Sequence, residues 1–199
     1  MKPVRLAILG LGTVGVGALK LLQENAAEIK RRTGREIQIT HVGTRRPRPD
    51  LQLEGIKQSS DLMEIVRQPD VDVVVEVMGG IHPAYEVIME AIKHGKQVVT
   101  ANKALLAEHG NELFKAAEDN AVQIAYEAAV AGGIPIIKVI REGLAANHIE
   151  WLAGIINGTG NFILTEMREK GRAFDDVLKE AQELGYAEAD PTFDVEGID

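Results

Sequence analysis

The sequence of 199 residues predicts an α/β protein built on a doubly wound parallel sheet, followed by part of a smaller α+β domain. A glycine-rich turn at residues 10–15 joins an apolar segment to an amphipathic one. Strand-like and helix-like segments then alternate as far as Tyr126. Residues 71–78 (VDVVVEVM) are almost continuous valine, which is typical of a strand buried on both faces. Together these features indicate a Rossmann-type fold.

The elements before the valine-rich strand follow from apolar periodicity and from residues that start or stop helices. Gly34 ends the first helix, and Asp61 can cap the next one. In order, we expect a strand at Val4–Leu9, a helix at 13–32, a strand at 36–42, a polar loop at 43–55 and a short helix at 60–66.

The elements after the valine-rich strand repeat the same alternation. Gly79 and Gly80 end that strand, and Pro83 is compatible with the first turn of the following helix. In order, we expect a helix ending near His94, a strand at Gln97–Thr100, a helix at Lys103–Asp119 and a strand at 122–126.

The character of the sequence changes after Tyr126, where small residues and glycines replace the periodic pattern. We place the first domain at residues 1–130 and a second at 131–199, which is small for an independent core. The second should hold a helix at 136–143, a strand at 148–157, a turn at 158–160, helices at 161–170 and 174–184 and an acidic loop at 185–199. It has no closing element, so we expect the sequence to be part of a longer protein.

Composition excludes several classes of protein. The formal net charge is −8, which argues against nucleic acid as a partner, because phosphate contacts need clustered lysine and arginine. The absence of cysteine excludes disulfides, thiolate catalysis and thiolate metal sites. No apolar run approaches the roughly 18 residues of a membrane helix, and we expect no signal peptide, because a strand and a glycine turn occupy the N-terminal residues. We therefore expect a cytoplasmic protein with no membrane partner.

The glycine-rich turn has the pattern G-x-G-x-x-G in the context that gives it meaning, between a strand and a helix. Gly10 allows a tight turn, Gly12 lets a pyrophosphate approach the backbone, and Gly15 lets the helix pack on the strand. The new helix directs free N–H groups and its positive dipole end at the phosphates. The predicted dinucleotide-binding residues are Gly10, Leu11, Gly12, Thr13, Val14 and Gly15. The alternative is a turn whose glycines serve packing only.

The residues after the second strand favour NADP(H) over NAD(H), although NAD(H) stays possible. An NAD site usually has an acidic residue there to hold the ribose 2′-hydroxyl. Here the strand runs into Arg45 and Arg46, and guanidinium groups suit a 2′-phosphate. The alternative is that these two residues and Arg48 belong to a solvated loop.

Four further motifs, together with the glycine turn, make the whole chain resemble the homoserine dehydrogenase family. They are residues 100–105 (TANKAL), 127–137 (EAAVAGGIPII), 154–167 (GIINGTGNFILTEM) and 180–199 (EAQELGYAEADPTFDVEGID). The resemblance implies an oxidoreductase that interconverts homoserine and aspartate semialdehyde with a nicotinamide cofactor, in threonine and methionine biosynthesis. It also implies that the intact protein is a homodimer.

The resemblance assigns roles around the cofactor. Lys103, after a strand end, would lie against the cofactor and the reacting centre as a catalytic residue. Thr100, Met78 and Gly79 lie at neighbouring strand ends and would line the nicotinamide or its ribose. The backbone of Gly185 would also touch the cofactor.

A monovalent cation site, for Na⁺ or K⁺, is implied by the same resemblance. Glu127 would provide a carboxylate oxygen, and Val130, Gly132 and Ile134 would provide backbone carbonyls. Hard cations prefer oxygen ligands, which fits this set. Without the resemblance, the glycines of this segment indicate a hinge.

The acidic tail would hold the substrate, because a carboxylate suits the ammonium group of homoserine. The resemblance assigns Glu188 and Asp199 to substrate binding, with Asp194 nearby. It also makes Asp199 a residue of the catalytic site, and it places the proton-donating lysine four residues beyond Asp199. We therefore expect these 199 residues to bind cofactor but to be catalytically impaired. Two alternatives stay open: an NADP-binding module without turnover, and another Rossmann dehydrogenase of a small amino acid or sugar.

Overall fold

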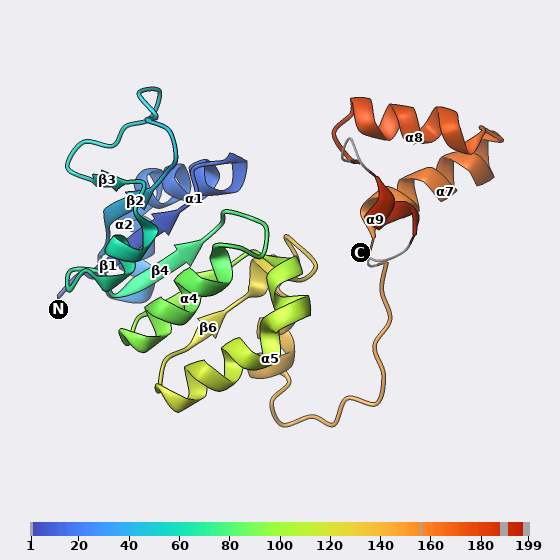
Figure 1. The fold of residues 1–199 in the computed structure, drawn as a ribbon. Helices are drawn as coiled ribbons and strands as arrows, with labels where there is room; N and C mark the ends of the chain where they lie inside the picture. Colours follow the sequence, from blue (N-terminus) through green and yellow to red (C-terminus); the bar gives the residue numbers. More distant parts are fainter. Residues whose placement is uncertain (1, 156, 188–190, 197–199) are drawn as a thin grey trace. The chain divides into compact units, whose positions relative to one another are not determined.

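The computed structural model describes residues 2–155, 157–187 and 191–196, which fall into two compact units (Figure 1). The first unit is Met1–Ala145 and the second is Ala146–Asp199. The first unit therefore extends to Ala145, beyond residue 130, at which we placed the end of the first domain. Glu127 holds the segment after residue 130, because its carboxylate accepts hydrogen bonds from the amides of Ile137 and Lys138, each at 2.9 Å.

The first unit contains a parallel sheet of six strands in the order β3-β2-β1-β4-β5-β6. The strands are β1 (Val4–Leu9), β2 (Ile37–Gly43), β3 (Lys57–Ser59), β4 (Val73–Glu76), β5 (Gln97–Thr100) and β6 (Ile124–Ala125). Strand β1 lies between β2 and β4, with Val4 opposite Ile37 and Leu9 opposite both Gly43 and Glu76. The strand order reverses at β1, so the β1/β4 boundary is the topological switch point of the sheet.

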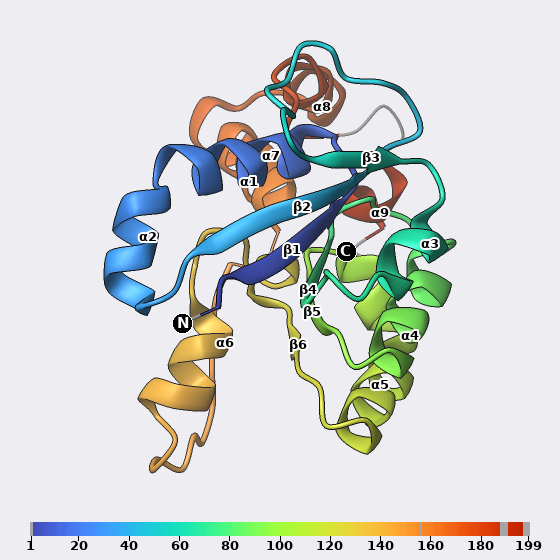
Figure 2. The same cartoon turned by 90° about the vertical axis from the view of Figure 1, so that its left-hand side faces the viewer.

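Helices cover both faces of this sheet, which confirms the doubly wound, Rossmann-type α/β fold (Figure 2). Helices α1 and α2 lie on one face, and α3, α4 and α5 lie on the other. The helices are α1 (Thr13–Glu24), α2 (Ala26–Thr33), α3 (Leu62–Arg67), α4 (Ala84–Lys93) and α5 (Lys103–Asp119). After β6 come the short 3-10 helix η1 (Glu127–Ala129), α6 (Ile136–Lys138) and the π-helical turn η2 (Val139–Gly143).

Strand β1 divides the hydrophobic core into two parts through the alternation of its side chains. Leu6 and Ile8 pack with Leu19 of α1 in one cluster. Ala7 and Leu9 belong to the other, which contains the buried residues of α3, α4 and α5. Each fully buried leucine or isoleucine contributes about 1.5–3 kcal/mol relative to an exposed one, so both helix layers are fixed on the central strand.

Three differences from the predicted elements of this unit have local causes. The expected helix 13–32 is two helices, because Asn25 leaves helical geometry and its side-chain amide bonds the carbonyl of Leu21 at 3.0 Å. Strand β3 was not predicted, since its three residues follow a polar loop and gain their order from pairing with β2. The predicted strands at 71–78 and 122–126 are present but shorter.

The second unit has helices α7 (Gly158–Lys170), α8 (Phe174–Glu183) and α9 (Thr192–Val195). Helix α7 begins at the predicted turn, because the side chain of Asn157 caps the amide of Gly160. The strand predicted at 148–157 is absent from the described residues 148–155 and 157. Its apolar side chains are exposed and find no neighbouring strand there: Trp151, Leu152 and Ile155 are 74–78% exposed. The short α9 lies inside the stretch predicted as acidic loop.

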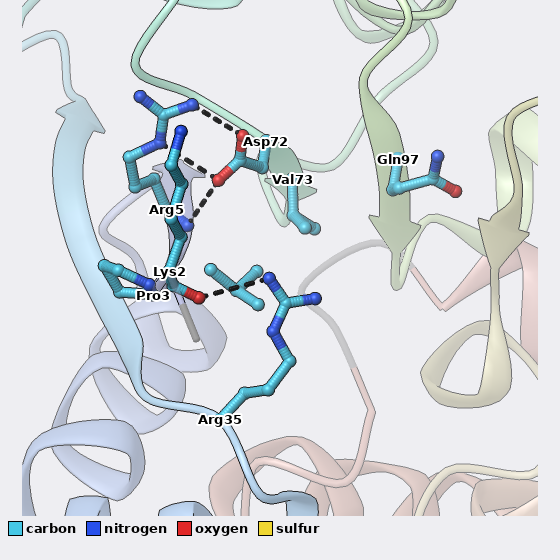
Figure 3. Close-up of a pocket in the computed structure, with 8 residues that line it drawn as sticks. Lys2, Pro3, Arg5, Arg35, Asp72, Val73 and Gln97 are labelled. Carbon is cyan, nitrogen blue, oxygen red and sulfur yellow. Dashed lines mark hydrogen bonds and ion pairs between the residues drawn. The ribbon is translucent and has the colours of Figure 1, made fainter.

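An ion pair joins the first residues of β1 to the start of β4 (Figure 3). The carboxylate of Asp72 accepts hydrogen bonds from the backbone amide of Arg5 at 2.8 Å and from its guanidinium at 3.0 and 2.7 Å. The Arg5 guanidinium lowers the pKa of Asp72 from 3.8 to about 2. The pair therefore stays charged across the neutral and mildly acidic range.

We expect Asp72→Asn to lower the free energy of unfolding by about 1 kcal/mol at pH 7, because the pair is partly exposed and solvent screens it. The folded-state pKa is depressed, so the contribution is present above pH 3.8 and is lost as the pH falls towards 2. Urea unfolding of both proteins at pH 7 and pH 2.5 measures this. A difference that does not shrink at the lower pH would contradict the assignment.

Candidate dinucleotide-binding site

The carboxyl ends of the parallel strands bring most of the predicted cofactor residues to one edge of the first unit. Gly10 follows β1, Arg45 follows β2, Met78 follows β4 and Lys103 follows β5. Hydrogen bonds join the strand ends: Gly10 N donates to Gly43 O at 2.9 Å, and Val77 N donates to Leu9 O at 2.9 Å. Open α/β sheets bind ligands at this edge, beside the switch point.

The three glycines of the turn meet different steric demands. Gly10 has φ +103°, and a Cβ on it would lie 2.7 Å from Val77 O. A Cβ on Gly15 would lie 1.9 Å from the carbonyl oxygen of Gly10. A Cβ on Gly12 would meet nothing within 4 Å, so space lies open beside it. Gly10 and Gly15 are therefore required by the turn itself, whereas Gly12 leaves room for another molecule.

The start of α1 can receive an anion. Its N-cap is Gly12, no side chain of the described residues caps it, and its first turn holds no acidic residue. The first amides of a helix have no partner inside the helix, and the dipole is positive there. Thr13 and Val14 are exposed in this turn. The geometry fits the diphosphate of a dinucleotide, which would be held by backbone amides beside Gly12.

Two exposed arginines follow β2 after a single residue, Thr44. The hydroxyl of Thr44 donates to the carbonyl of Arg46 at 2.7 Å and forms a tight turn there. Arg45 and Arg46 are exposed, and their guanidinium groups form no hydrogen bond or ion pair with the other described residues. Their position at the end of the strand next to β1 matches the region where a dinucleotide places its adenosine ribose.

The end of β4 holds a buried carboxylate that was not among the predicted residues. Glu76 is fully buried; one oxygen accepts a hydrogen bond from Thr100 Oγ1 at 2.6 Å, and the other accepts from Met78 N at 2.8 Å. The hydroxyl of Thr100 accepts from Asn102 N at 3.0 Å. The sequence signal that could have revealed Glu76 is an acidic residue with valine on both sides, inside a strand expected to be buried on both faces.

Asn102 continues this network to the loop after β4. Its side-chain nitrogen donates to Gly80 O at 2.6 Å, and its Oδ1 accepts from Leu105 N at 3.1 Å, which caps α5. The network fixes the segment that carries Met78 and Gly79, and Gly79 has φ +73°. Lys103 is the first residue of α5 and is exposed. Thr100 is thus buried among protein groups, while Met78, Gly79 and Lys103 reach the surface of the same edge.

The four residues predicted to hold a cation lie in one segment of the first unit, which runs from η1 to the residues before α6. Both oxygens of Glu127 accept backbone amides of the segment at 137–138, and the Ile134 carbonyl accepts from Ile136 N at 2.8 Å. Val130 and Gly132 lie between them. Glu127 also lines a cavity of about 690 Å³ next to β6. No cluster of three or more histidine, aspartate or glutamate side chains suited to a metal exists within the described residues.

The predicted substrate residues belong to the second unit. Glu188 and Asp199 lie outside the described residues, and Asp194 is part of α9. Gly185 follows α8 with φ +75°.

A different cavity, of about 580 Å³, lies at the opposite edge of the sheet (Figure 3). The segment 2–5, Asp72 and Gln97 line it at the amino ends of β1, β4 and β5. The guanidinium of Arg35 reaches across to the carbonyl oxygen of Lys2 at 3.2 Å. Its place at the amino ends of the strands separates it from the site described above.

Two family models match the chain. "Homoserine dehydrogenase, NAD binding domain" matches residues 10–127, and "Homoserine dehydrogenase" matches residues 135–199. The structure has no helix, within its described residues, that combines the length and apolar character needed to cross a membrane.

Curated relatives match along the full chain. The homoserine dehydrogenase of Pseudomonas aeruginosa is 61% identical over 199 residues, covering 100% of this chain and 46% of the relative. That of Bacillus subtilis is 43% identical over 201 residues, with 100% and 46% covered. The chain thus spans about half the length of the curated relatives it matches.

Solved structures agree with these matches. A homoserine dehydrogenase from Thiobacillus denitrificans superposes with a TM-score of 0.93 at 59% identity, covering 100% of this chain and 46% of that one. A hyperthermophilic archaeal homoserine dehydrogenase in complex with NADPH superposes with a TM-score of 0.82 at 31% identity, covering 100% and 66%.

Proposed function

The chain belongs to the homoserine dehydrogenase family, and from this we propose that it is the coenzyme-binding portion of an enzyme that interconverts homoserine and aspartate semialdehyde. The observation that carries the proposal is the turn between β1 and α1, where Gly12 leaves open space beside an uncapped helix start. The match over residues 135–199 favours this reaction over that of another Rossmann dehydrogenase. The intact protein is proposed to be a cytoplasmic homodimer in threonine and methionine biosynthesis.

The coenzyme site is proposed to use the carboxyl edge of the sheet. The amides of residues 12–15 would bind the diphosphate, and Arg45 and Arg46 would bind the 2′-phosphate of NADP. Met78 and Gly79, held in place by Glu76, would face the nicotinamide and its ribose. When bound, the nicotinamide donates or accepts the hydride of the reaction. The NADPH complex of an archaeal relative supports a coenzyme of this class.

The remaining catalytic groups are proposed from the family resemblance. Lys103 would contact the coenzyme or the reacting oxygen, with Gly185 beside the coenzyme. Glu188, Asp194 and Asp199 would bind the ammonium group of homoserine. The proton would come from a lysine that is not among the 199 residues, so we expect these residues to bind coenzyme and to turn over slowly or not at all.

We also propose that residues 1–130 form the coenzyme domain and that residues 131–199 begin the catalytic domain. A monovalent cation, Na⁺ or K⁺, would bind the loop of Glu127, Val130, Gly132 and Ile134 through oxygen ligands. Each oxygen of Glu127 accepts one backbone amide, and a carboxylate oxygen has a second lone pair for a cation.

The preference for NADP is tested with the double variant Arg45→Ala/Arg46→Ala. Because both guanidinium groups are exposed at the end of β2, we expect NADPH binding to weaken by about 10²-fold, consistent with the loss of two charge-assisted contacts. NADH lacks the 2′-phosphate, so its affinity should change little. Isothermal titration with each coenzyme measures the two dissociation constants.

The matched control is Arg31→Ala/Arg32→Ala on α2, which removes the same charge from an exposed site paired with Glu28. This control should leave both dissociation constants nearly unchanged. Equal losses for NADPH and NADH in the Arg45/Arg46 variant would show that these arginines do not read the 2′-phosphate.

A further inference from the structure

The loop between β2 and β3 is tied to the glycine turn by Arg48. Its Nη1 donates to the backbone carbonyl of Leu11, the second residue of the G-x-G-x-x-G motif. Its Nε and Nη2 donate to the two carboxylate oxygens of Asp50 at 2.9 and 2.7 Å. Only 31% of the Arg48 side chain is exposed, so this residue differs from the neighbouring, exposed Arg45 and Arg46.

Other contacts hold the same loop against the first βα unit. Gln23 on α1 donates its side-chain amide to Gln52 O at 3.0 Å. Leu53 is buried in the core cluster that contains Leu11 and Leu19. The amide of Leu51 donates to Arg48 O at 3.2 Å, which forms a turn around the ion pair. The loop therefore has a defined position over α1 and the glycine turn.

We propose that Arg48, held by Asp50, is a positioning residue that fixes the loop carrying Arg45 and Arg46 against the phosphate-binding turn. This inference rests on the proposed coenzyme function. A loop of this length loses conformational freedom when it closes on a ligand, and a loop that is already held loses less on binding. The Arg48–Leu11 contact joins the loop after β2, which would bind the 2′-phosphate, to the glycine turn, which would bind the diphosphate.

The charge of the Arg48–Asp50 pair distinguishes two roles for Arg48, which are to position the loop and to attract a phosphate directly. Asp50 balances the charge of Arg48, and the Arg48 guanidinium lowers the pKa of Asp50 to about 2, so both stay charged near neutral pH. The net pull of this pair on a phosphate is therefore small. If Arg48 acted only by its charge, removing the nearby carboxylate of Asp50 would strengthen the binding of an anion. If Arg48 positions the loop, removing Asp50 releases Arg48 and weakens binding.

The test compares Arg48→Ala and Asp50→Ala with the wild-type protein in titrations with NADPH and NADH. We expect both variants to weaken NADPH binding by about tenfold, the effect of ordering one or two side chains, and NADH binding by less. The amide of Leu51, and that of Ile56, which donates to Leu53 O at 3.1 Å, should exchange hydrogen faster in both variants, while the melting temperature stays near the wild-type value. Arg32→Ala, which removes an exposed, paired arginine on α2, is the control and should change none of these.

Two results would overturn the inference alone, given a wild-type protein that binds NADPH. One is unchanged NADPH affinity in both variants. The other is weaker binding in Arg48→Ala together with tighter binding in Asp50→Ala, which would make Arg48 a direct electrostatic ligand. A wild-type protein that binds neither coenzyme would overturn the proposed function, and the inference with it.

Discussion

Gly15→Ala should abolish detectable coenzyme binding and lower the free energy of unfolding by about 3 kcal/mol or more. The added Cβ would lie 1.9 Å from the carbonyl oxygen of Gly10, a backbone atom of the turn. Neither α1 nor the end of β1 can move away without disturbing Leu19 or Ile8 in the core. Urea unfolding and a titration with NADPH measure the two effects.

Gly17→Ala is the matched control, because it places the same methyl group in the same helix, where nothing lies within 4 Å. Alanine is the better helix former by about 0.5–1 kcal/mol, so this variant should be slightly more stable and should bind coenzyme normally. Normal binding by Gly15→Ala would show that the contact between α1 and the turn is not needed for the site.

Glu76→Ala should cost about 2–4 kcal/mol of stability and should weaken coenzyme binding. The change leaves the hydroxyl of Thr100 and the amide of Met78 without their acceptor in a fully buried place, and it creates a cavity. The segment Met78–Gly80 would then lose the hydrogen bond to Glu76 and keep the one from Asn102 to Gly80 O. Chemical unfolding and the NADPH dissociation constant measure the outcome.

Glu76→Gln separates the shape of this side chain from its chemistry. Glutamine keeps the volume and can accept from Met78 N, but its amide nitrogen cannot accept from Thr100 Oγ1. Its effect should therefore lie between the wild type and Glu76→Ala. If both variants were as stable as the wild type, Glu76 would not hold the carboxyl edge of the sheet together.

Elements set by local patterns could be predicted from the sequence. The bounds of β1, β5 and α5 match the predicted ranges, since apolar strands and capped helices carry their signals within a few residues. The break at Asn25 and strand β3 were not predicted. The break depends on one side-chain hydrogen bond, and the strand depends on pairing with β2. The strand predicted near Trp151 was wrong because apolar sequence alone does not supply a neighbouring strand.

The candidate site divides in the same way. The glycine turn, Arg45 and Arg46 were predicted because a short motif and one strand end define them. Glu76 and Asn102 were not, because their hydrogen bonds reach partners 24 and 22 residues away along the chain. Arg48 bonds a carbonyl 37 residues away, and the sequence allowed only a solvated loop there. These contacts follow from the sheet order, which brings distant strand ends together.

A titration of the wild-type protein with NADPH and with NADH tests the proposed coenzyme site most directly. Coenzyme fluorescence should saturate at one equivalent, and NADPH should bind more tightly than NADH, as the open space at Gly12 and the arginines after β2 require. Failure to bind either coenzyme, in a sample whose circular dichroism shows the folded state, would contradict it.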